Sequence, residues 1–332
     1  MSKRNDSPST PDPSHAGSTR SRSAPPPIET VADLVAAAAR HGVWITSERP
    51  DFDRSGLDFL VVHGRDDAGT PWVVRTPRRP DVVATARIEA RALRLVRSHL
   101  PVAVPDWQVH ADDVIAYPRL GGLPAVTFDP ATGVTWNVIE QGNLPDAFLD
   151  SVASALAALQ SIAPADAERA GVPTRTIRGV RDALGRSMDA TRDVLAPPEH
   201  VWRRWRRWLD DDGVWPHHVA LVHGDLHPGH MLLDDDGHLT GILDWTDAQV
   251  TDPLVDLAMF LGCFGRTALE ALVPRFERLG GRTWPRLVDH AAERWAAFSV
   301  LGAEWALHAG NQTALEHSRG QLATVAAEVD PG

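Results

Sequence analysis

The spacing of hydrophobic positions divides the chain into a mixed first part and a mostly helical second part. Between residues 43 and 77, two β-rich runs, GLDFLVVHG and PWVVRTP, are separated by the turn sequence DDAG. The runs VADLVAAAARH before them and DVVATARIEARALRLVRSHL after them have helical spacing. Thr30 and Asp33 suit the start of the first helix and Gly42 its end.

Residues 101–121 complete the first part. Pro101 and Pro105 end the second helix, and DDVIAYP predicts another strand. The Gly-Gly pair at 121–122 predicts a flexible connector. Residues 1–27 are rich in Ser, Pro, Arg and Asp with almost nothing apolar. Such a segment cannot bury enough apolar surface to offset its ordering entropy. We therefore predict a disordered tail over residues 1–27 and a small lobe over residues 28–121.

Residues 122–332 predict a larger lobe made mostly of helices. LPDAFLDSVASALAALQSI predicts a helix that begins near Pro145, and VWRRWRRWLDD predicts another whose tryptophans share one face. The short strands ALVHG and HLTGILDW lie on either side of MLLDD, and helices resume after Pro253. The predicted fold class is α+β, with a small β-rich lobe followed by a larger helical lobe.

Composition and charge narrow the possible partners. The formal net charge of −11 argues against nucleic acid, because binding a phosphate backbone requires clustered cations. No apolar run approaches the roughly 20 residues that span a bilayer, and the N-terminal sequence lacks the apolar core of a secretory signal. Cys263 is the only cysteine, which excludes an intramolecular disulfide and suits a reducing compartment. We expect a cytoplasmic monomer without a membrane partner.

Lys3 is the only lysine in the chain. A catalytic lysine inside the fold is therefore excluded, and a cation that binds phosphate there must be arginine. The sequence contains neither GxxxxGK[ST] nor GxGxxG, so neither a P-loop nor a dinucleotide-binding fold is supported.

The segment LVHGDLHPGHMLLDDDGHLTGILDW contains the main cluster of candidate catalytic residues. A predicted strand runs into HGD at residues 223–225, and the run MLL then turns at DDDG into a strand that ends at Asp244. This hairpin is expected to bring Asp225, His230 and Asp244 together. Phosphoryl transfer needs one carboxylate for the hydroxyl proton, and a second carboxylate with another ligand for Mg²⁺.

The same segment resembles the signature of the aminoglycoside phosphotransferase family, HGDxxxxN followed by a hydrophobic–Asp–Trp/Phe motif, except that His230 replaces Asn. HGDLxxGH followed by IxDW resembles the macrolide 2′-phosphotransferases in particular. The other matching stretches, in order within residues 30–325, are WVVRTPRRP, AVPDW, AYP, WRRWLDDDGVWP and GGRTWPRL. The resemblance implies a bilobal protein-kinase-like fold and Mg²⁺-dependent transfer of the γ-phosphate of GTP, or of ATP, to a macrolide 2′-hydroxyl. Such transfer inactivates the antibiotic.

The family pattern implies a role for each polar residue of the segment. Asp225 would be the catalytic base and Asp244 a metal ligand. His230 would take the second metal-side position, either as a direct ligand or by bonding a phosphate or a metal-bound water, because neutral imidazole is a poorer Mg²⁺ ligand than oxygen. His223 and His227 would support the loop, His223 through backbone hydrogen bonds.

Asp256 is a further supporting residue by the same resemblance. It lies in the first turns of the helix that follows Asp252-Pro253. A kinase-like fold implies that its carboxylate bonds the backbone of the catalytic loop. The alternative is an ordinary carboxylate that interacts with the helix dipole.

Candidate nucleotide-binding residues lie in the first lobe. Arg75 on a predicted strand and Glu89 on the next helix occupy the positions of the cation–glutamate pair of kinase-like folds; the alternative is an unrelated surface Arg and helix Glu. Ser55 and Gly56 are candidates for a loop that covers the phosphates.

The stretch AYPRL resembles the hinge that binds a purine through backbone groups. Pro118 has no N–H, so the donor must come from Tyr117, Arg119 or Leu120. Ala116 completes this candidate hinge. The macrolide kinases prefer GTP, so we expect GTP as a donor, though not exclusively.

A macrolide is a large apolar ring with a dimethylamino sugar, so its site needs an apolar wall and one negative charge. Asp225, Asp247 and Glu304 are candidates for that charge. The last 60 residues are not unusually acid-rich, which favours a macrolide over an aminoglycoside with its several amines. The candidate wall residues, each also a candidate for the core, are Met259, Phe260, Phe264, Trp295, Phe298 and Trp305.

Three other functions stay open at this point. A kinase of this superfamily can act on homoserine, choline or a sugar. A non-catalytic nucleotide-binding module is a second alternative, although Asp225 and Asp244 are intact. A zinc hydrolase is a third, but the spacing of the histidines and aspartates around His223 fits no zinc motif known to us.

Overall fold

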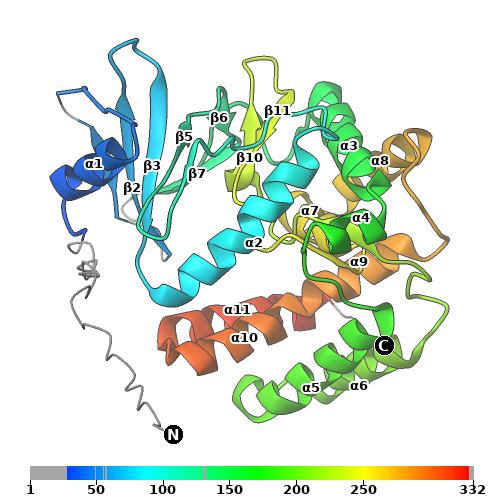
Figure 1. Ribbon diagram of the computed structural model, residues 1–332. Helices are drawn as coiled ribbons and strands as arrows, with labels where there is room; N and C mark the ends of the chain where they lie inside the picture. Colours follow the sequence, from blue (N-terminus) through cyan, green and yellow to red (C-terminus); the bar gives the residue numbers. More distant parts are fainter. Residues whose placement is uncertain (1–27, 49, 55, 57, 130–131, 329–332) are drawn as a thin grey trace, which may run out of the picture.

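The computed structural model describes residues 28–48, 50–54, 56, 58–129 and 132–328. The predicted tail over residues 1–27 and the candidate residue Ser55 lie outside the described residues. A lobe built on a β-sheet is followed by a larger, mostly helical lobe (Figure 1). The predicted α+β class and two-lobe architecture are therefore confirmed.

The small lobe is an antiparallel five-stranded sheet with strand order β1-β2-β3-β5-β4. Alternate residues of the sheet face opposite helices: Val74 and Ala116 pack with helix α1, whereas Val73 and Tyr117 pack with helix α2. Thr30 and Asp33 form the expected capping box of α1. The elements are α1 (Val31–Arg40), β1 (Asp51–Asp53), β2 (Phe59–Arg65), β3 (Pro71–Pro77), α2 (Pro80–Val96), β4 (Val109–His110) and β5 (Ile115–Pro118).

Short strands at the base of the large lobe position the candidate catalytic segment. β10 (Met231–Leu233) and β11 (Leu239–Ile242) form the predicted hairpin, and β6 (Leu123–Pro124) pairs with β10. β9 (Ala220–Val222) pairs with β12 (Gln249–Thr251), a strand that the sequence did not predict. A further hairpin joins β7 (Val126–Asp129) to β8 (Gly133–Trp136).

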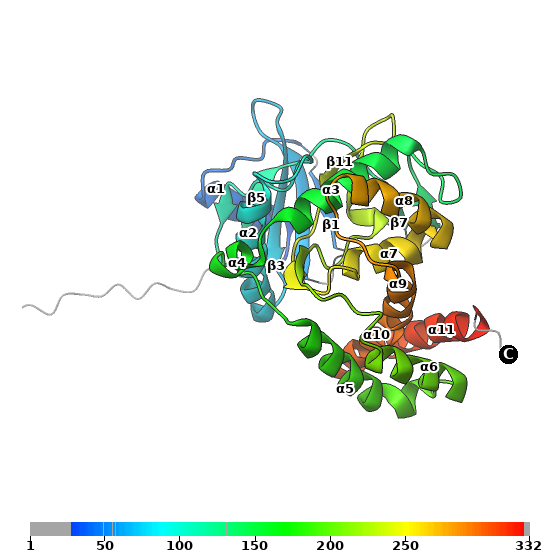
Figure 2. The same ribbon diagram turned by 90° about the vertical axis from the view of Figure 1, so that its right-hand side faces the viewer.

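The helices of the large lobe form two groups. The main core surrounds α3, α7 and α8, and a second core contains α5, α6, α10 and α11, which lie together below the catalytic segment in Figures 1 and 2. Over the described residues, no helix has the length and apolar character needed to cross a membrane. The helices are α3 (Asp146–Ser161), α4 (Pro164–Arg169), α5 (Ile177–Leu195), α6 (Glu199–Asp210), α7 (Val255–Phe264), α8 (Arg266–Arg278), α9 (Leu287–Ala296), α10 (Phe298–Ala309) and α11 (Gln312–Glu328).

Candidate active site

The candidate catalytic loop begins where β9 ends and passes through the 3₁₀ turn η1 (Pro228–His230) into β10. Gly224 has a φ of +95°. A Cβ atom at this position would lie 2.3 Å from the carbonyl oxygen of Asp247. Only glycine fits here, because both the backbone conformation and the close approach exclude a side chain.

Asp256, near the start of α7, holds the first residues of this loop. Its carboxylate accepts hydrogen bonds from the backbone N–H groups of His223 at 2.8 Å and Gly224 at 2.9 Å. Burial raises the pKa of Asp256 to about 6, although these two bonds act in the opposite direction. The contact implied by the family resemblance is present, so Asp256 does more than interact with a helix dipole.

Backbone hydrogen bonds determine which nitrogen of each loop histidine carries the proton. His223 donates from Nε2 to the Leu243 carbonyl at 2.9 Å, and burial lowers its pKa to about 3, so the ring is neutral. His230 donates from Nδ1 to the Asp225 carbonyl at 2.9 Å, which leaves the Nε2 lone pair available when the ring is neutral. His227 accepts at Nδ1 from the Gly229 N–H at 3.0 Å, so its neutral form carries the proton on Nε2.

These side chains converge on two carboxylates. His230 Nδ1 lies 3.8 Å from Asp225 Oδ2, and His230 Nε2 lies 3.8 Å from Asp244 Oδ2. The side chains of Asp225 and Asp244 are 38% and 46% exposed, so both are accessible from the cleft. The hairpin β10–β11 therefore brings Asp225, His230 and Asp244 together, as the sequence predicted.

Asp244 follows β11 in an unusual backbone conformation, with a φ of +58°. Few residues other than glycine adopt this left-handed conformation, and those that do cluster at functional sites. Desolvation acts to raise the pKa of Asp244, but the positive charge that His230 carries when it is protonated, hydrogen bonding by Thr246 and the charge of Arg75 together lower it. Asp244 is therefore held ionised, as a metal ligand must be.

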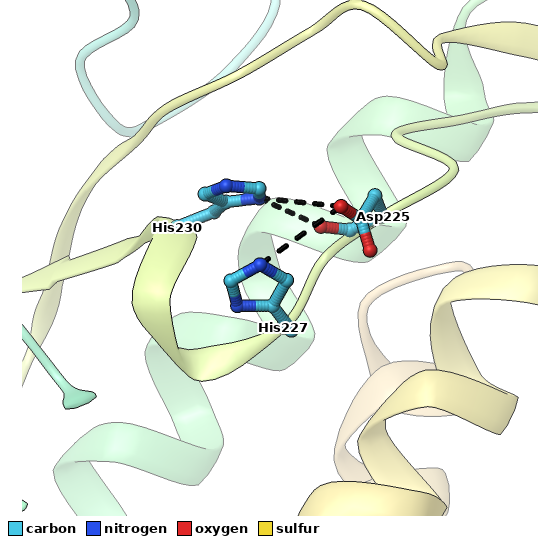
Figure 3. A group of neighbouring side chains, drawn as sticks. All are labelled: Asp225, His227 and His230. Atoms are coloured by element: carbon cyan, nitrogen blue, oxygen red, sulfur yellow. Dashed lines mark hydrogen bonds and ion pairs between the residues drawn. The ribbon is translucent and has the colours of Figure 1, made fainter. Parts of the chain in front are cut away.

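The pair of His230 and Asp244 fits a divalent cation. The neutral imidazole has a free Nε2 lone pair, and a carboxylate oxygen of Asp244 lies 3.8 Å from it. A second possible cluster, Asp225, His227 and His230, has its ligand atoms within 4.8 Å of one another (Figure 3). His227 fits a metal less well, because binding through Nε2 would require the proton on Nδ1, where the Gly229 N–H is accepted.

Arg75 and Glu89 form a buried ion pair in the small lobe, with Nη2 and Oε2 2.6 Å apart. The guanidinium of Arg75 lies over the rings of Phe59 at 4.3 Å and Trp107 at 4.7 Å. Glu89 also accepts a hydrogen bond from Thr246 Oγ1 at 3.3 Å. Arg75 and Glu89 are therefore buried partners rather than two unrelated surface residues. Through Glu89 the pair connects the small lobe to the segment that carries Asp244.

A cavity of about 590 Å³ lies between Arg75, the hinge and the catalytic loop. Five predicted nucleotide residues line it together with the three predicted catalytic and metal residues, whereas Ala116 is buried behind it. The sequence did not predict the other lining residues. The alternation of residues along a strand does not show which face of the strand borders a cleft. The lining residues are Asp53, Gly56, Asp58, Phe59, Val61, His63, Val73, Arg75, Tyr117, Arg119, Leu120, Gly122, Pro124, Asp225, His227, His230, Leu232, Leu243 and Asp244.

Of the three candidate backbone donors in the hinge, two already point to β3. The N–H of Arg119 donates to the Pro71 carbonyl at 2.8 Å. Hydrogen-bonded pairs alternate in an antiparallel ladder, and Tyr117 lies opposite Val73, two residues along. The N–H of Tyr117 therefore points to β3, which leaves Leu120 as the candidate donor toward the cavity.

Two of the acidic acceptor candidates, Asp247 and Glu304, lie in different environments. Asp247 is exposed beside the candidate catalytic loop. Partial desolvation by the surrounding protein, and then the charges of Asp225 and Asp244, raise its pKa to about 6. Glu304 instead accepts a hydrogen bond from Ser187 Oγ at 2.7 Å between α10 and α5.

The apolar candidates for the acceptor wall also lie in different environments. Phe260 and Phe264 are buried against Phe148 in the main core, so the core alternative is correct for both. Trp295 packs over Gly262 of α7, where a Cβ atom would lie 2.3 Å from its ring. The other three are surface-accessible to differing degrees: Met259 and Phe298 are half-buried, and Trp305 is exposed.

A kinase-like fold with this aspartate pair defines a phosphotransferase. Residues 52–290, more than half of the chain, match the phosphotransferase enzyme family, and the chain belongs to this family. The GDP complex of aminoglycoside 2′-phosphotransferase-IIIa, 18% identical over 89% of this chain and 97% of that chain, has the same fold with a TM-score of 0.72.

More similar relatives are macrolide phosphotransferases. The chain is 38% identical to macrolide 2′-phosphotransferase type I (TM-score 0.81; 89% of this chain, 98% of the other). It is 34% identical to macrolide 2′-phosphotransferase MphH from Brachybacterium faecium (TM-score 0.80; 88% and 97%). It is also 37% identical over 280 residues to the uncharacterized protein YcbJ of Bacillus subtilis (strain 168), covering 84% of this chain and 91% of YcbJ.

Proposed function

We propose that this protein transfers the γ-phosphate of GTP, or of ATP, to the 2′-hydroxyl of a macrolide antibiotic. The observation that carries the proposal is the convergence of Asp225, His230 and Asp244 at the end of the cavity that also contains Arg75. The likeness to two macrolide 2′-phosphotransferases at 38% and 34% identity supports the choice of acceptor.

In this mechanism Asp225 is the residue that meets the acceptor hydroxyl. Its carboxylate takes up the hydroxyl proton while the hydroxyl oxygen forms a bond to the γ-phosphorus, and the bond from that phosphorus to the leaving diphosphate breaks. The Nε2–H of His227 faces Asp225 Oδ2 at 3.9 Å. Asp256 and His223 keep the loop in place through the bonds described above.

His230 Nε2 and Asp244 are the protein groups proposed to hold Mg²⁺. When bound there, the cation would neutralise charge on the phosphate oxygens. Arg75 supplies the other positive charge, since no lysine occurs in the described residues. Glu89 keeps the pKa of the Arg75 guanidinium raised despite its burial, so Arg75 remains a cation beside the phosphates.

The nucleotide base is proposed to lie against the hinge, where Leu120 N–H is the remaining donor. Asp247 is proposed to meet the dimethylamino group of the acceptor, because it is exposed and lies beside Asp225. Glu304 is not part of this proposal, since its carboxylate already accepts a hydrogen bond from Ser187.

The test is mass spectrometry of erythromycin after incubation with the protein, GTP and Mg²⁺. We expect a gain of one phosphate, a much slower gain with the Asp225→Asn variant, and a weaker or absent reaction with kanamycin. ATP in a parallel reaction measures the donor preference. Phosphorylation of kanamycin with no change in erythromycin would contradict the acceptor assignment and leave the phosphotransferase activity standing.

A binding measurement tests the acceptor without catalysis. Erythromycin at about 100 times its dissociation constant should stabilise the protein by roughly 2.7 kcal/mol. Kanamycin should give little stabilisation, because its ammonium groups need several carboxylates. The erythromycin effect should persist at moderate salt, since apolar burial is not screened.

A further inference from the structure

His63 lies in β2 on the face of the small-lobe sheet that borders the cavity proposed to hold the nucleotide. In the antiparallel register it stands opposite Val73 of β3, and Val73 stands opposite Tyr117 of β5. Residues directly opposite each other share a face of the sheet, and all three line the cavity of about 590 Å³. The imidazole of His63 is therefore part of the wall that a bound nucleotide meets.

The register also shows which part of a nucleotide His63 would meet. Arg75, the proposed phosphate cation, stands opposite Val61, two residues along β2 from His63. A strand rises about 3.3 Å per residue, so His63 is displaced by about 7 Å from the level of Arg75. The displacement is toward the hinge, because Pro118 pairs with Trp72 at the same end of β3. His63 therefore lies at the end of the cavity proposed to hold the base.

The two nitrogens of the His63 ring are in different environments. Nδ1 is buried and has no hydrogen-bond partner among the described residues. The structural ring of His223 differs, because Nε2 donates to the Leu243 carbonyl and Nδ1 accepts from the Asp225 N–H at 3.3 Å. An unpaired N–H in a protein interior is rarer than an unused acceptor lone pair. We therefore assign the lone pair of the neutral His63 ring to Nδ1 and the proton to Nε2.

The charges around His63 keep the ring neutral at pH 7. Burial, and then the positive charge of Arg119 in the hinge, lower its pKa from the ordinary value of 6.5. The carboxylates of Asp51 and Asp53 in β1 act in the opposite direction and are outweighed. A neutral imidazole with a buried Nδ1 offers the cavity one polar group, the Nε2–H donor.

A hydrogen-bond donor at this end of the cavity distinguishes the two purines. Guanine has two adjacent acceptors, O6 and N7, along one edge, whereas adenine has the N6 amino group, a donor, in place of O6. A protein N–H that faces O6 gains a hydrogen bond. The same N–H facing an amino group leaves two donors opposed and unpaired, which costs binding free energy.

We propose that His63 donates from Nε2 to the O6–N7 edge of guanine and makes the protein favour GTP over ATP as phosphate donor. The inference rests on the proposed function and assigns its donor preference to a side chain of β2. Leu232 and Leu243, which line the same cavity from the large lobe, have no polar side-chain group that could make this distinction.

The test is calorimetric binding of GDP and of ADP, each with Mg²⁺, to the full-length protein. The wild type should bind GDP more tightly than ADP. His63→Phe keeps a planar ring and removes the donor, so its Kd for GDP should rise about tenfold or more while its Kd for ADP stays within about twofold. His63→Gln keeps an N–H donor and should recover part of the preference for GDP.

His110→Phe is the matched control. His110 lies in β4 of the same sheet, is exposed, and is not among the described residues that line the cavity. Its replacement should leave both dissociation constants at the wild-type values. If His63→Phe does not fold, His63→Leu removes the same donor and is measured in its place.

Three results would overturn the inference. Equal affinity of the wild type for GDP and ADP means that the site does not select the base. An unchanged ratio of the two affinities in His63→Phe means that another group selects it. A similar loss of both affinities means that the ring of His63 only packs against the nucleotide. Failure of the proposed function is distinguishable, because the wild type would then leave erythromycin unphosphorylated with either donor.

Discussion

Two clusters of histidine and aspartate in the large lobe show how the same residue types serve different purposes. One is the candidate catalytic loop with Asp225, His230 and Asp244. The other is a buried cluster in which His290 Nε2 donates to Asp252 Oδ2 at 3.0 Å. Both side chains of the buried pair are 0% exposed, whereas the aspartates of the loop are more than a third exposed.

The partners of each group explain the difference. In the buried cluster, Trp208 donates from Nε1 to His290 Nδ1 at 3.0 Å, and Arg294 Nε lies 3.3 Å from Asp252. Both nitrogens of His290 therefore have protein partners, which is the requirement for burying a polar group. In the loop, the hydrogen bond of His230 to the described residues is made at Nδ1, and its Nε2 faces an accessible carboxylate at 3.8 Å. A complete set of partners indicates structure, and an incomplete set in a cleft indicates binding.

The largest expected effect is on turnover, from Asp225→Asn. Loss of the proton acceptor should lower kcat by about 10² to 10⁴-fold. The melting temperature should stay close to that of the wild type, because among the described residues the nearest histidine nitrogens lie 3.8 and 3.9 Å from the Asp225 carboxylate, beyond hydrogen-bond distance. Erythromycin phosphorylation and thermal unfolding measure the two quantities. Near wild-type turnover would show that Asp225 is not the base.

Asp252→Ala should have the opposite profile. Removing one partner of a buried ion pair should lower the free energy of unfolding by about 3–5 kcal/mol. The reason is that His290 Nε2–H loses its acceptor and the buried Arg294 loses its counter-ion. Urea denaturation measures the change, with Asp225→Asn as the matched control. A change as small as that of the control would remove the distinction between the two clusters.

His230 separates metal binding from folding. His230→Ala should raise the Mg²⁺ concentration for half-maximal activity by at least the roughly 10- to 100-fold that loss of a supporting residue costs. His230→Asn should lose less, since Asn offers an oxygen ligand for Mg²⁺. Activity titrated with Mg²⁺ is the measurement. Equal Mg²⁺ requirements for the wild type and His230→Ala would exclude His230 from the metal site.

The smallest effect concerns pH. Burial acts to raise the pKa of Asp252, but His290 and Arg294 outweigh it, so its folded pKa is lowered. A lowered carboxylate pKa contributes stability above the unfolded value of about 3.9 and loses it as the pH falls toward the folded value. The difference in unfolding free energy between the wild type and Asp252→Asn should therefore be constant near pH 6 and shrink below about pH 4. A difference that grows on acidification would reverse the assigned sign.

Much of the architecture follows from local pattern. β-rich runs next to turn residues predicted β2, β3 and β5, and helical spacing predicted α1, α2 and α3. The turn DDDG predicted the hairpin that brings Asp225 and Asp244 together. These elements could be predicted because neighbouring residues determine them. The pairing of Arg75 with Glu89 came from family resemblance rather than from local pattern, since nothing local joins a strand to a helix 14 residues away.

Other features depended on contacts between distant segments, and only the tertiary structure decided them. Elements far apart in sequence meet where β12 pairs with β9 and where Phe260 packs on Phe148. They also meet where Ser187 donates a hydrogen bond to Glu304. The pattern of residues 123–136 did not predict the β7–β8 hairpin beside the catalytic loop. The physical reason is that periodicity shows which side of an element is apolar, whereas long-range packing decides whether that side meets the core, a ligand or solvent.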